Sequence, residues 1–381
     1  MEQSDAEFRA EVRAFLAEHL PRDLAERTAL GYHQDRQDIE QWTRVLAKKG
    51  GWSVPSWPVE YGGPGWTIAQ RHAFDEECYL AGAPALSPQG TFLTGPIIIA
   101  HGSPEQKARF LPRIRDGVEF WAQGFSEPEA GSDVAAMCCS ARADGDQWVL
   151  NGTKTWISNA GIADFYTVFA RTDDTGGAKG ISCFIVEAGT PGFEVTERID
   201  LVAPHPLGTL TFSDCRIPRA HLVGEEGRGF GIAMATLDVF RSTVAAAALG
   251  MARRALDETL DYTAERNIFG GKLGDLQLVQ AKIGEMALGV DSSALLVYRA
   301  AWTKDCAAER VTREAAMAKY HATETAQQVI DAAVQLHGGK GVTKGYIVEA
   351  LYRDIRALRI YEGASEVQTT IIARQTIANH A

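Results

Sequence analysis

The spacing of apolar residues changes twice along this chain of 381 residues, and this change constrains the fold more than any other feature. Up to about residue 120 apolar residues recur at helical spacing. Short alternating runs separated by turn clusters follow, and from residue 231 helical spacing returns in longer stretches. We therefore expect an α+β chain with an N-terminal α-helical bundle at 1–120, a central antiparallel β-barrel or sandwich at 121–230, and a C-terminal four-helix bundle at 231–381.

Local signals predict the individual elements. Ser4 followed by Glu7 matches a capping box that begins the first helix. In the central block Asn151-Gly152, between two apolar runs, predicts a tight β-hairpin. The other strands are expected at 165–170, 181–186, 193–196 and 209–212. The helices are expected at 39–49, 67–81, 96–101, 104–116, 239–266, 276–303, 311–337 and 369–377.

Composition excludes several classes of protein. The formal net charge of −11 argues against a nucleic-acid-binding protein, which normally carries a basic face. No apolar run reaches about 18 residues, so we expect no membrane span. The N-terminal residues lack a basic segment followed by an apolar one, so we expect no signal peptide. The six cysteines are scattered without metal-ligand spacing, which predicts no metal site and favours free thiols in a reducing cytoplasm.

The segment Tyr361–Glu366 is the strongest candidate for chemistry. It places the carboxylate of Glu362 between an aromatic residue and a glycine, on a short connection between two helical stretches. A carboxylate held there can accept a proton from a bound substrate, and Gly363 lets the backbone approach a ligand. The alternative is an ordinary polar turn between helices.

Other polar segments are candidate ligand sites. The run 121–133 combines small residues, hydroxyls and backbone donors, and could hold a flat ring or be a turn-rich linker. Trp156 and Ser158 are two residues apart, so in a strand they share one face and could stack on and hydrogen-bond to a ring. Arg266 before two glycines, and the glycine-rich segment 335–341, could meet phosphates or be capped helix ends.

Taken together and in this order, these segments resemble the FAD-dependent acyl-CoA dehydrogenases, from about residue 5 to the end of the chain. The segments that carry the resemblance are 126–133, 152–159, 222–230, 266–270, 335–339 and 361–363. The resemblance implies dehydrogenation of an acyl-CoA thioester to a trans-2-enoyl-CoA. It also implies FAD as cofactor and an electron-transfer flavoprotein as electron acceptor.

The resemblance assigns the catalytic role to Glu362. In this family the glutamate of the Tyr-Glu-Gly loop removes the α-proton, while the β-hydrogen passes as hydride to flavin N5. The backbone N–H of that glutamate and the flavin ribityl chain stabilise the enolate. Some members carry the base elsewhere, at a position matched here by Phe240, which cannot act as a base.

The remaining roles follow from the same resemblance. Substrate contacts are expected from Ser132, Asp238, Phe240, Arg241, Tyr361 and Gly363. Contacts to the flavin ring are expected from Gln123, Phe125, Ser126, Trp156 and Ser158. The diphosphate and adenosine, on a neighbouring subunit's flavin, are expected to meet Arg266, Phe269, Gln277, Gln335, Gly338 and Gly339. His337 and Glu366 are also expected among the cofactor-binding residues. This arrangement implies a homodimer or homotetramer.

Three departures from the family pattern point to a specialised subfamily. Ala364 stands where many members have threonine, and Gln123 where many have tyrosine or leucine. The run His205–Gly208 replaces a Ser-x-Thr-Arg type sequence close to the expected CoA entrance.

Other functions remain open from the sequence alone. An acyl-CoA oxidase, a monooxygenase, a desulfinase and a non-catalytic flavin-bound scaffold could share this framework. Retention of Glu362 disfavours a monooxygenase and a scaffold, because neither needs an α-proton base. The sequence does not determine the acyl group, or whether its carrier is CoA or an acyl carrier protein.

Overall fold

The computed structural model describes residues 4–30, 32, 35–84, 89–173, 176–203, 205–306 and 310–380. The chain forms two compact units, each described here by itself. The first comprises Met1–Ala25 and His33–Thr236, and the second Glu26–Tyr32 and Leu237–Ala381. The boundary expected after residue 120 falls inside the first unit.

Five of the six N-terminal helices form where the local signals predict them. The six are α1 (Asp5–His19), α2 (Arg22–Ala29), α3 (Arg36–Lys48), α4 (Ile68–Leu80), α5 (Gly95–His101) and α6 (Pro104–Arg115). The capping box is confirmed, because the Ser4 hydroxyl accepts a hydrogen bond from the N–H of Glu7, and the Glu7 carboxylate accepts one from the N–H of Ser4. The periodicity missed α2 and the π-helical turn at Gln89–Thr94.

The central block is one eight-stranded sheet. Its strands are β1 (Trp121–Gly124), β2 (Ser140–Asp144), β3 (Gln147–Ser158), β4 (Phe165–Arg171), β5 (Ile181–Glu187), β6 (Phe193–Ile199), β7 (Leu207–Pro218) and β8 (Leu222–Val223). The strand order is β6-β7-β3-β2-β4-β5-β8, and β1 also pairs with β4. The sheet is mixed rather than antiparallel as predicted, because β4 pairs in parallel with β1 and, at one position, with β2. Strand periodicity reveals which faces are buried but not which strand becomes the neighbour.

The predicted hairpin at Asn151-Gly152 is wrong. Both residues lie inside the continuous strand β3, which pairs with β2 on one side and β7 on the other. The tight turn falls instead at Gly145-Asp146, since Asp144 pairs with Gln147 across it. Gly152 has a φ of 139° at an irregularity in the β3–β7 register, so its backbone freedom serves a bulge and not a turn.

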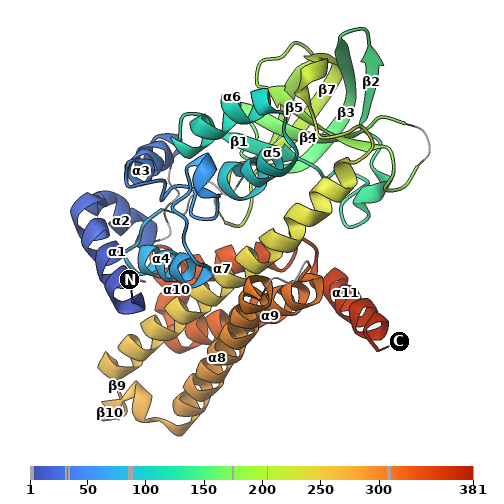
Figure 1. The fold of residues 1–381 in the computed structure, drawn as a ribbon. Helices are drawn as coiled ribbons and strands as arrows, with labels where there is room; N and C mark the ends of the chain where they lie inside the picture. The colour runs from blue at the N-terminus through green and yellow to red at the C-terminus, as the bar shows by residue number, and fades with distance from the viewer. Residues whose placement is uncertain are drawn as a thin grey trace. The chain divides into compact units, whose positions relative to one another are not determined.

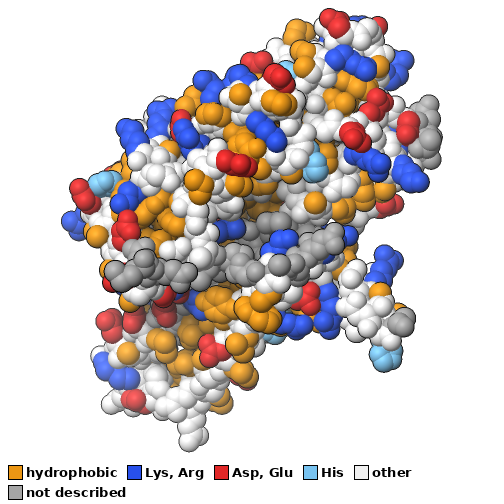
Figure 2. All heavy atoms as spheres, viewed as in Figure 1, with side chains coloured by type: hydrophobic (Ala, Val, Ile, Leu, Met, Phe, Trp, Pro, Cys, Tyr) orange, Lys and Arg blue, Asp and Glu red, His pale blue; other side chains and the backbone are white. Residues whose placement is uncertain are grey.

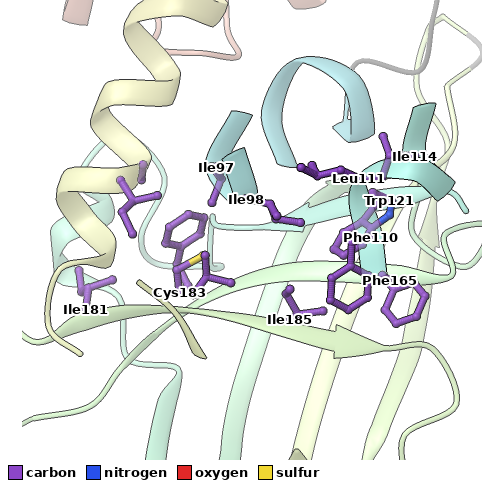
Figure 3. Close-up of a cluster of buried hydrophobic side chains, with 14 of the residues drawn as sticks. Ile97, Ile98, Phe110, Leu111, Ile114, Trp121, Phe165, Ile181, Cys183 and Ile185 are labelled. Atoms are coloured by element: carbon purple, nitrogen blue, oxygen red, sulfur yellow. The ribbon is translucent and has the colours of Figure 1, made fainter. Parts of the chain in front are cut away.

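Helices α5 and α6 pack on the sheet through the apolar cluster in Figure 3. The Trp121 indole of β1 stacks on the Phe165 ring of β4, with 5.1 Å between ring centroids, and the edge of Phe110 from α6 meets Trp121 at 5.3 Å. Because helices and sheet share this core, the first unit holds both.

The second unit is a helical bundle. Its elements are α7 (Gly229–Glu265, of which the second unit takes Leu237 onward), β9 (Asn267–Ile268), β10 (Gly271–Lys272), α8 (Gln277–Asp305), α9 (Thr312–His337), α10 (Ile347–Leu358) and α11 (Ser365–Ala378). Helix α9 lies beside α8, and also contacts α10 and α11 (Figure 1). Within the second unit the described residues form five α-helices instead of the four expected, because the periodicity also missed α10.

One helix qualifies the expectation of no membrane span. Among the described residues, α7 is long and apolar enough to cross a membrane by length and composition. Half of its most apolar window is buried in the protein, and the core helix of a soluble protein passes the same test, so this is weak evidence.

Figure 2 shows Lys and Arg side chains interspersed with Asp and Glu on the face in view.

Candidate active site

Glu362 lies at a strained point of the backbone, between α10 and α11. Its φ of 56° is left-handed, an uncommon conformation for a residue with a Cβ, and Gly363 follows with a φ of 89°. Strain of this kind persists only where surrounding contacts enforce it, and it clusters at functional sites. The turn therefore differs from an ordinary helix-to-helix connection.

The contacts that hold this turn come from α9 and α11. The Lys319 ammonium and the Gln368 side-chain amide each donate a hydrogen bond to the Gly363 carbonyl oxygen, both at 2.9 Å. The Glu324 carboxylate binds Arg359 at the end of α10 and the Ser365 hydroxyl at the start of α11. The turn is thus fastened at both ends and at its centre.

The electrostatic surroundings tune the carboxyl group of Glu362. Burial raises its pKa to about 7, while the nearby cations Arg241 and Lys319 act in the opposite direction. A carboxylate with a pKa near neutrality is a stronger base than an exposed one, yet still ionises at physiological pH. Among the described residues, none accepts a hydrogen bond from the N–H of Glu362, so this donor is available to a ligand.

The expected substrate residues fall in both units. Phe240 and Arg241 are buried on α7 within the second unit, and Arg241 interacts electrostatically with Glu362. Tyr361 is exposed beside the base. Ser132 is exposed in the first unit, in the segment after β1. The Asp238 side chain lies outside the described residues.

In the first unit, the residues expected around a flavin ring gather on β1, β3 and the segment after β1. The backbone carbonyl of Ser126 accepts a hydrogen bond from the N–H of Thr155 at 3.0 Å, so the two segments are joined at this point. A register irregularity between Lys154 and Ile157 displaces the intervening residues from the β7 ladder. Trp156 sits there with a φ of 61° and 59% of its side chain exposed. An exposed indole on a strained bulge indicates a binding surface.

A buried ion pair fixes this segment to the strand. Lys154 is fully buried and donates to a Glu127 carboxylate oxygen at 2.8 Å and to the Phe125 carbonyl at 3.0 Å. The Glu127 carboxylate in turn accepts hydrogen bonds from the backbone N–H groups of Cys138 and Cys139. The segment that carries Phe125 and Ser126 is therefore held at both ends.

Ser158 has a partner that the sequence did not suggest. His205, in the run that departs from the family pattern, lies with its Nε2 at 2.8 Å from the Ser158 hydroxyl. The half-buried Gln123 lies on β1, which pairs with β4.

The residues expected at a diphosphate lie at one end of the second unit. Arg266 lies between α7 and β9, the exposed Phe269 lies between β9 and β10, and Gln277 begins α8. Gly338 and Gly339, at the end of α9, are exposed. The two groups meet because the His337 ring stacks on Tyr262 of α7, with 4.4 Å between centroids.

Three other residues expected at the cofactor, His337, Glu366 and Gln335, lie in different surroundings. His337 is buried, with its Nδ1 at 2.8 Å from the Ala333 carbonyl, so its ring is engaged within the bundle. Glu366 lies instead near the Glu362 turn, in the first turn of α11. Gln335 is exposed on the last turn of α9.

The residues present fit a flavin dinucleotide. The first unit offers an exposed indole beside a hydroxyl, and the second offers an arginine with exposed glycines. Added Cβ atoms at Gly338 and Gly339 would meet nothing within 4 Å, so space for a ligand exists there. Taken by itself, the first unit's aromatic face and hydroxyl suit a flavin ring, and the second unit's guanidinium and backbone N–H groups suit a diphosphate.

Sequence reasoning missed the residues that support the site: Lys319, Glu324, Gln368, Glu127 and Lys154. The signal for Lys319 was present, because this lysine lies among the alanines of the buried face of α9. A buried lysine on such a face needs a partner. The other four carry no comparable pattern.

The fold combines a mixed sheet with two sets of helices, and the site offers a half-buried carboxyl group at a strained turn. Comparison with known proteins identifies the family. Family models match along the chain as acyl-CoA dehydrogenase N-terminal domain at residues 2–118, middle domain at 122–215 and C-terminal domain at 227–377. The chain belongs to the acyl-CoA dehydrogenase family, whose enzymes are FAD-dependent oxidoreductases acting on acyl-CoA.

Individual relatives are similar over most of their length. A 3-(aryl)acrylate reductase of Clostridium sporogenes is 37% identical over 94% of this chain and 97% of its own. The human mitochondrial short-chain specific acyl-CoA dehydrogenase is 41% identical over 85% of this chain and 79% of its own. A chain of the solved structure "Electron transferring flavoprotein of Acidaminococcus fermentans: Towards a mechanism of flavin-based electron bifurcation" is 34% identical, with a TM-score of 0.88, over 99% of this chain and 98% of that one.

Proposed function

We propose that this protein dehydrogenates an acyl-CoA thioester to a trans-2-enoyl-CoA, with Glu362 as the base that removes the α-proton. The observation that carries the proposal is the half-buried Glu362 carboxyl, whose pKa is raised to about 7 by burial at a strained turn. A structural carboxylate at a helix junction is usually solvated and needs no such environment.

The chain's own residues supply binding, orientation and proton transfer. Glu362 accepts the α-proton as a carboxylate, and its backbone N–H donates to the thioester carbonyl as negative charge develops there. Arg241 and Lys319 keep enough positive charge nearby for the carboxyl group to ionise at neutral pH. Phe240 and Tyr361 contact the acyl portion. FAD, when bound, accepts the β-hydride at its N5 atom.

The electrons then pass to an electron-transfer flavoprotein, as the similarity to the Acidaminococcus fermentans chain supports. An acyl-CoA oxidase, a desulfinase and a monooxygenase remain alternatives. Reoxidation of the reduced flavin separates the first of them, because an oxidase reoxidises rapidly in air. A dehydrogenase reoxidises rapidly only with the electron-transfer flavoprotein.

We further propose a homodimer or homotetramer in the cytoplasm. Leu288, Leu295 and Trp302 recur at seven-residue spacing on α8 and are 71%, 71% and 66% exposed. An apolar stripe of this kind is typical of a helix that packs against another copy.

Within one chain, 18 residues of α9, or about 27 Å of helix, separate Lys319 from His337. This separation supports the idea that the diphosphate residues serve a neighbouring subunit.

A single experiment tests the function. The purified protein is mixed anaerobically with a panel of acyl-CoAs that includes short-chain and aryl members, and bleaching of the flavin is followed. We expect at least one member to bleach the wild type, and Glu362→Gln to retain FAD but lose roughly 100-fold or more in rate. Equal rates for wild type and variant would remove Glu362 from the mechanism. Aryl and short-chain members are included because the relatives carry those names.

A further inference from the structure

Lys319 is a buried lysine in an apolar setting. Its side chain is fully buried on a face of α9 where Ala315, Ala318, Ala322 and Ala326 are also buried. Burying an ammonium group is costly unless hydrogen bonds and opposite charges compensate it. The contacts of the Lys319 Nζ must therefore compensate the cost of burying its charge.

The Nζ of Lys319 contacts the turn that carries the base. It donates to the Gly363 carbonyl oxygen at 2.9 Å, where Gln368 supplies a second donor from α11. Both φ angles at Glu362 and Gly363 are left-handed, so the chain reverses at the point that Lys319 binds. A non-glycine residue in this conformation needs such external support.

The charges that act on Lys319 come from the turn itself and from α7, α9 and α11. Glu362 of the turn, Glu324 of α9 and Glu366 of α11 favour the charged lysine, while Arg241 of α7 opposes it. Burial is the larger effect and lowers the pKa of Lys319 to about 8. Lys319 in turn favours ionisation of Glu362.

We infer that Lys319 is a positioning residue for the base: its ammonium holds the Gly363 carbonyl, keeps Glu362 in its left-handed conformation and favours the carboxylate form. This inference rests on the proposed role of Glu362. It assigns Lys319 no contact with the substrate and no proton transfer.

The test compares variants of the holoenzyme. Lys319→Met removes the charge and the donor at similar volume, and Lys319→Gln removes the charge and leaves a shorter N–H donor. Lys319→Arg keeps the charge. Thr323→Ala serves as the matched control, because Thr323 is buried one turn further along α9 and, among the described residues, its hydroxyl donates to the backbone carbonyls of Lys319 and Tyr320 in that helix, not to the turn.

Two measurements are made on each variant. The first is amide hydrogen exchange of the peptide covering residues 359–368, which reports on the turn and needs no turnover. The second is the pH dependence of anaerobic flavin bleaching by the acyl-CoA that reacts fastest with wild type. Glu362→Gln is measured alongside.

We expect Lys319→Met to speed exchange in the turn roughly tenfold or more, and to raise the pH midpoint of bleaching by about one unit. Lys319→Arg should restore the midpoint, Lys319→Gln should raise it, and Thr323→Ala should change neither measurement. If Lys319→Met does not fold, the pH midpoint of flavin bleaching by Lys319→Gln decides between the inference and its rejection. A folded Lys319→Met with wild-type exchange and midpoint, or a Lys319→Gln with the wild-type midpoint, overturns the inference.

The outcomes separate this inference from the proposed function. If Glu362→Gln bleaches at the wild-type rate, the proposed function fails, and exchange in the turn still tests the contact made by Lys319. If Glu362→Gln is inactive while Lys319→Met matches wild type in both measurements, only the inference about Lys319 fails.

Discussion

Lys154 on β3 and Glu127 after β1 form a buried ion pair, with 2.8 Å between Nζ and Oε1. Neither side chain is more than 8% exposed. The pair joins the segment that holds Phe125 and Ser126 to the bulged strand that holds Trp156. A pair of charges that no substrate has to touch thus organises the surface expected to bind the flavin ring.

Removing one charge of this pair should be costly. Glu127→Gln leaves the buried Lys154 ammonium without its counter-ion and replaces a carboxylate that accepts two backbone N–H groups. We expect a loss of roughly 3 kcal/mol or more in the free energy of unfolding, measured by denaturant titration. Glu129→Gln, at an exposed site two residues away, should leave stability within about 0.5 kcal/mol of wild type. Equal stabilities of the two variants would show that the pair contributes little.

Trp156→Ala should reduce FAD binding without unfolding the protein. The indole is 59% exposed, so its removal opens no cavity in the core, but it removes the aromatic face proposed for the flavin ring. We expect less flavin per chain after purification and a nearly unchanged Tm of the apoprotein. Val202→Ala, at a 68% exposed site of the same unit, is the control and should keep its full flavin content. A Trp156→Ala protein with full flavin content contradicts the proposed stacking.

The pKa of Glu362 predicts how stability depends on pH. Its folded-state pKa, about 7, lies above the ordinary value of 4.5, so the folded state retains a proton that the unfolded state releases. The contribution of this group to stability is therefore present below pH 4.5 and is lost as pH rises to about 7. Glu362→Gln should gain Tm relative to wild type at pH 8 but not at pH 4. A difference in Tm that is the same at both pH values would mean that burial does not raise this pKa.

Ala364 leaves α11 without a side-chain cap. It occupies the N-cap position with a φ of −54° and a ψ of 158°, and makes no capping hydrogen bond. Ala364→Ser should add one and stabilise the protein by about 1 kcal/mol. Ala373→Ser, in the exposed interior of the same helix, should instead destabilise it by about 0.5 kcal/mol. Thermal unfolding measures the stability of both variants. If other contacts already cap the start of α11, Ala364→Ser will not be more stable than wild type.

Arg266→Ala should release flavin and weaken the oligomer together, because we propose that Arg266 binds the diphosphate of a neighbouring subunit's cofactor. Flavin content and light-scattering mass are the measurements. Lys282→Ala removes an exposed positive charge from α8 and should change neither. An Arg266→Ala protein that keeps both its flavin and its mass argues against this shared site.

Several elements could be predicted from local sequence because their signals are local. The α1 capping box and the strands β4 and β5 lie where predicted, since hydrogen bonds between near neighbours and apolar periodicity define them. Asn151-Gly152 failed as a turn because two neighbouring strands pair with β3 across that point. Pairing between strands distant in sequence outweighed a local turn preference.

The sequence by itself determined the family, the order of helical and strand regions, and Glu362 as the candidate base. These depend on residue types at fixed spacing along the chain. Only the tertiary structure decided what surrounds that base: the left-handed turn, the Lys319 ammonium on the Gly363 carbonyl, and the burial that raises its pKa. The physical reason is that hydrogen bonding and desolvation depend on groups brought together by folding, here from α7, α9 and α11.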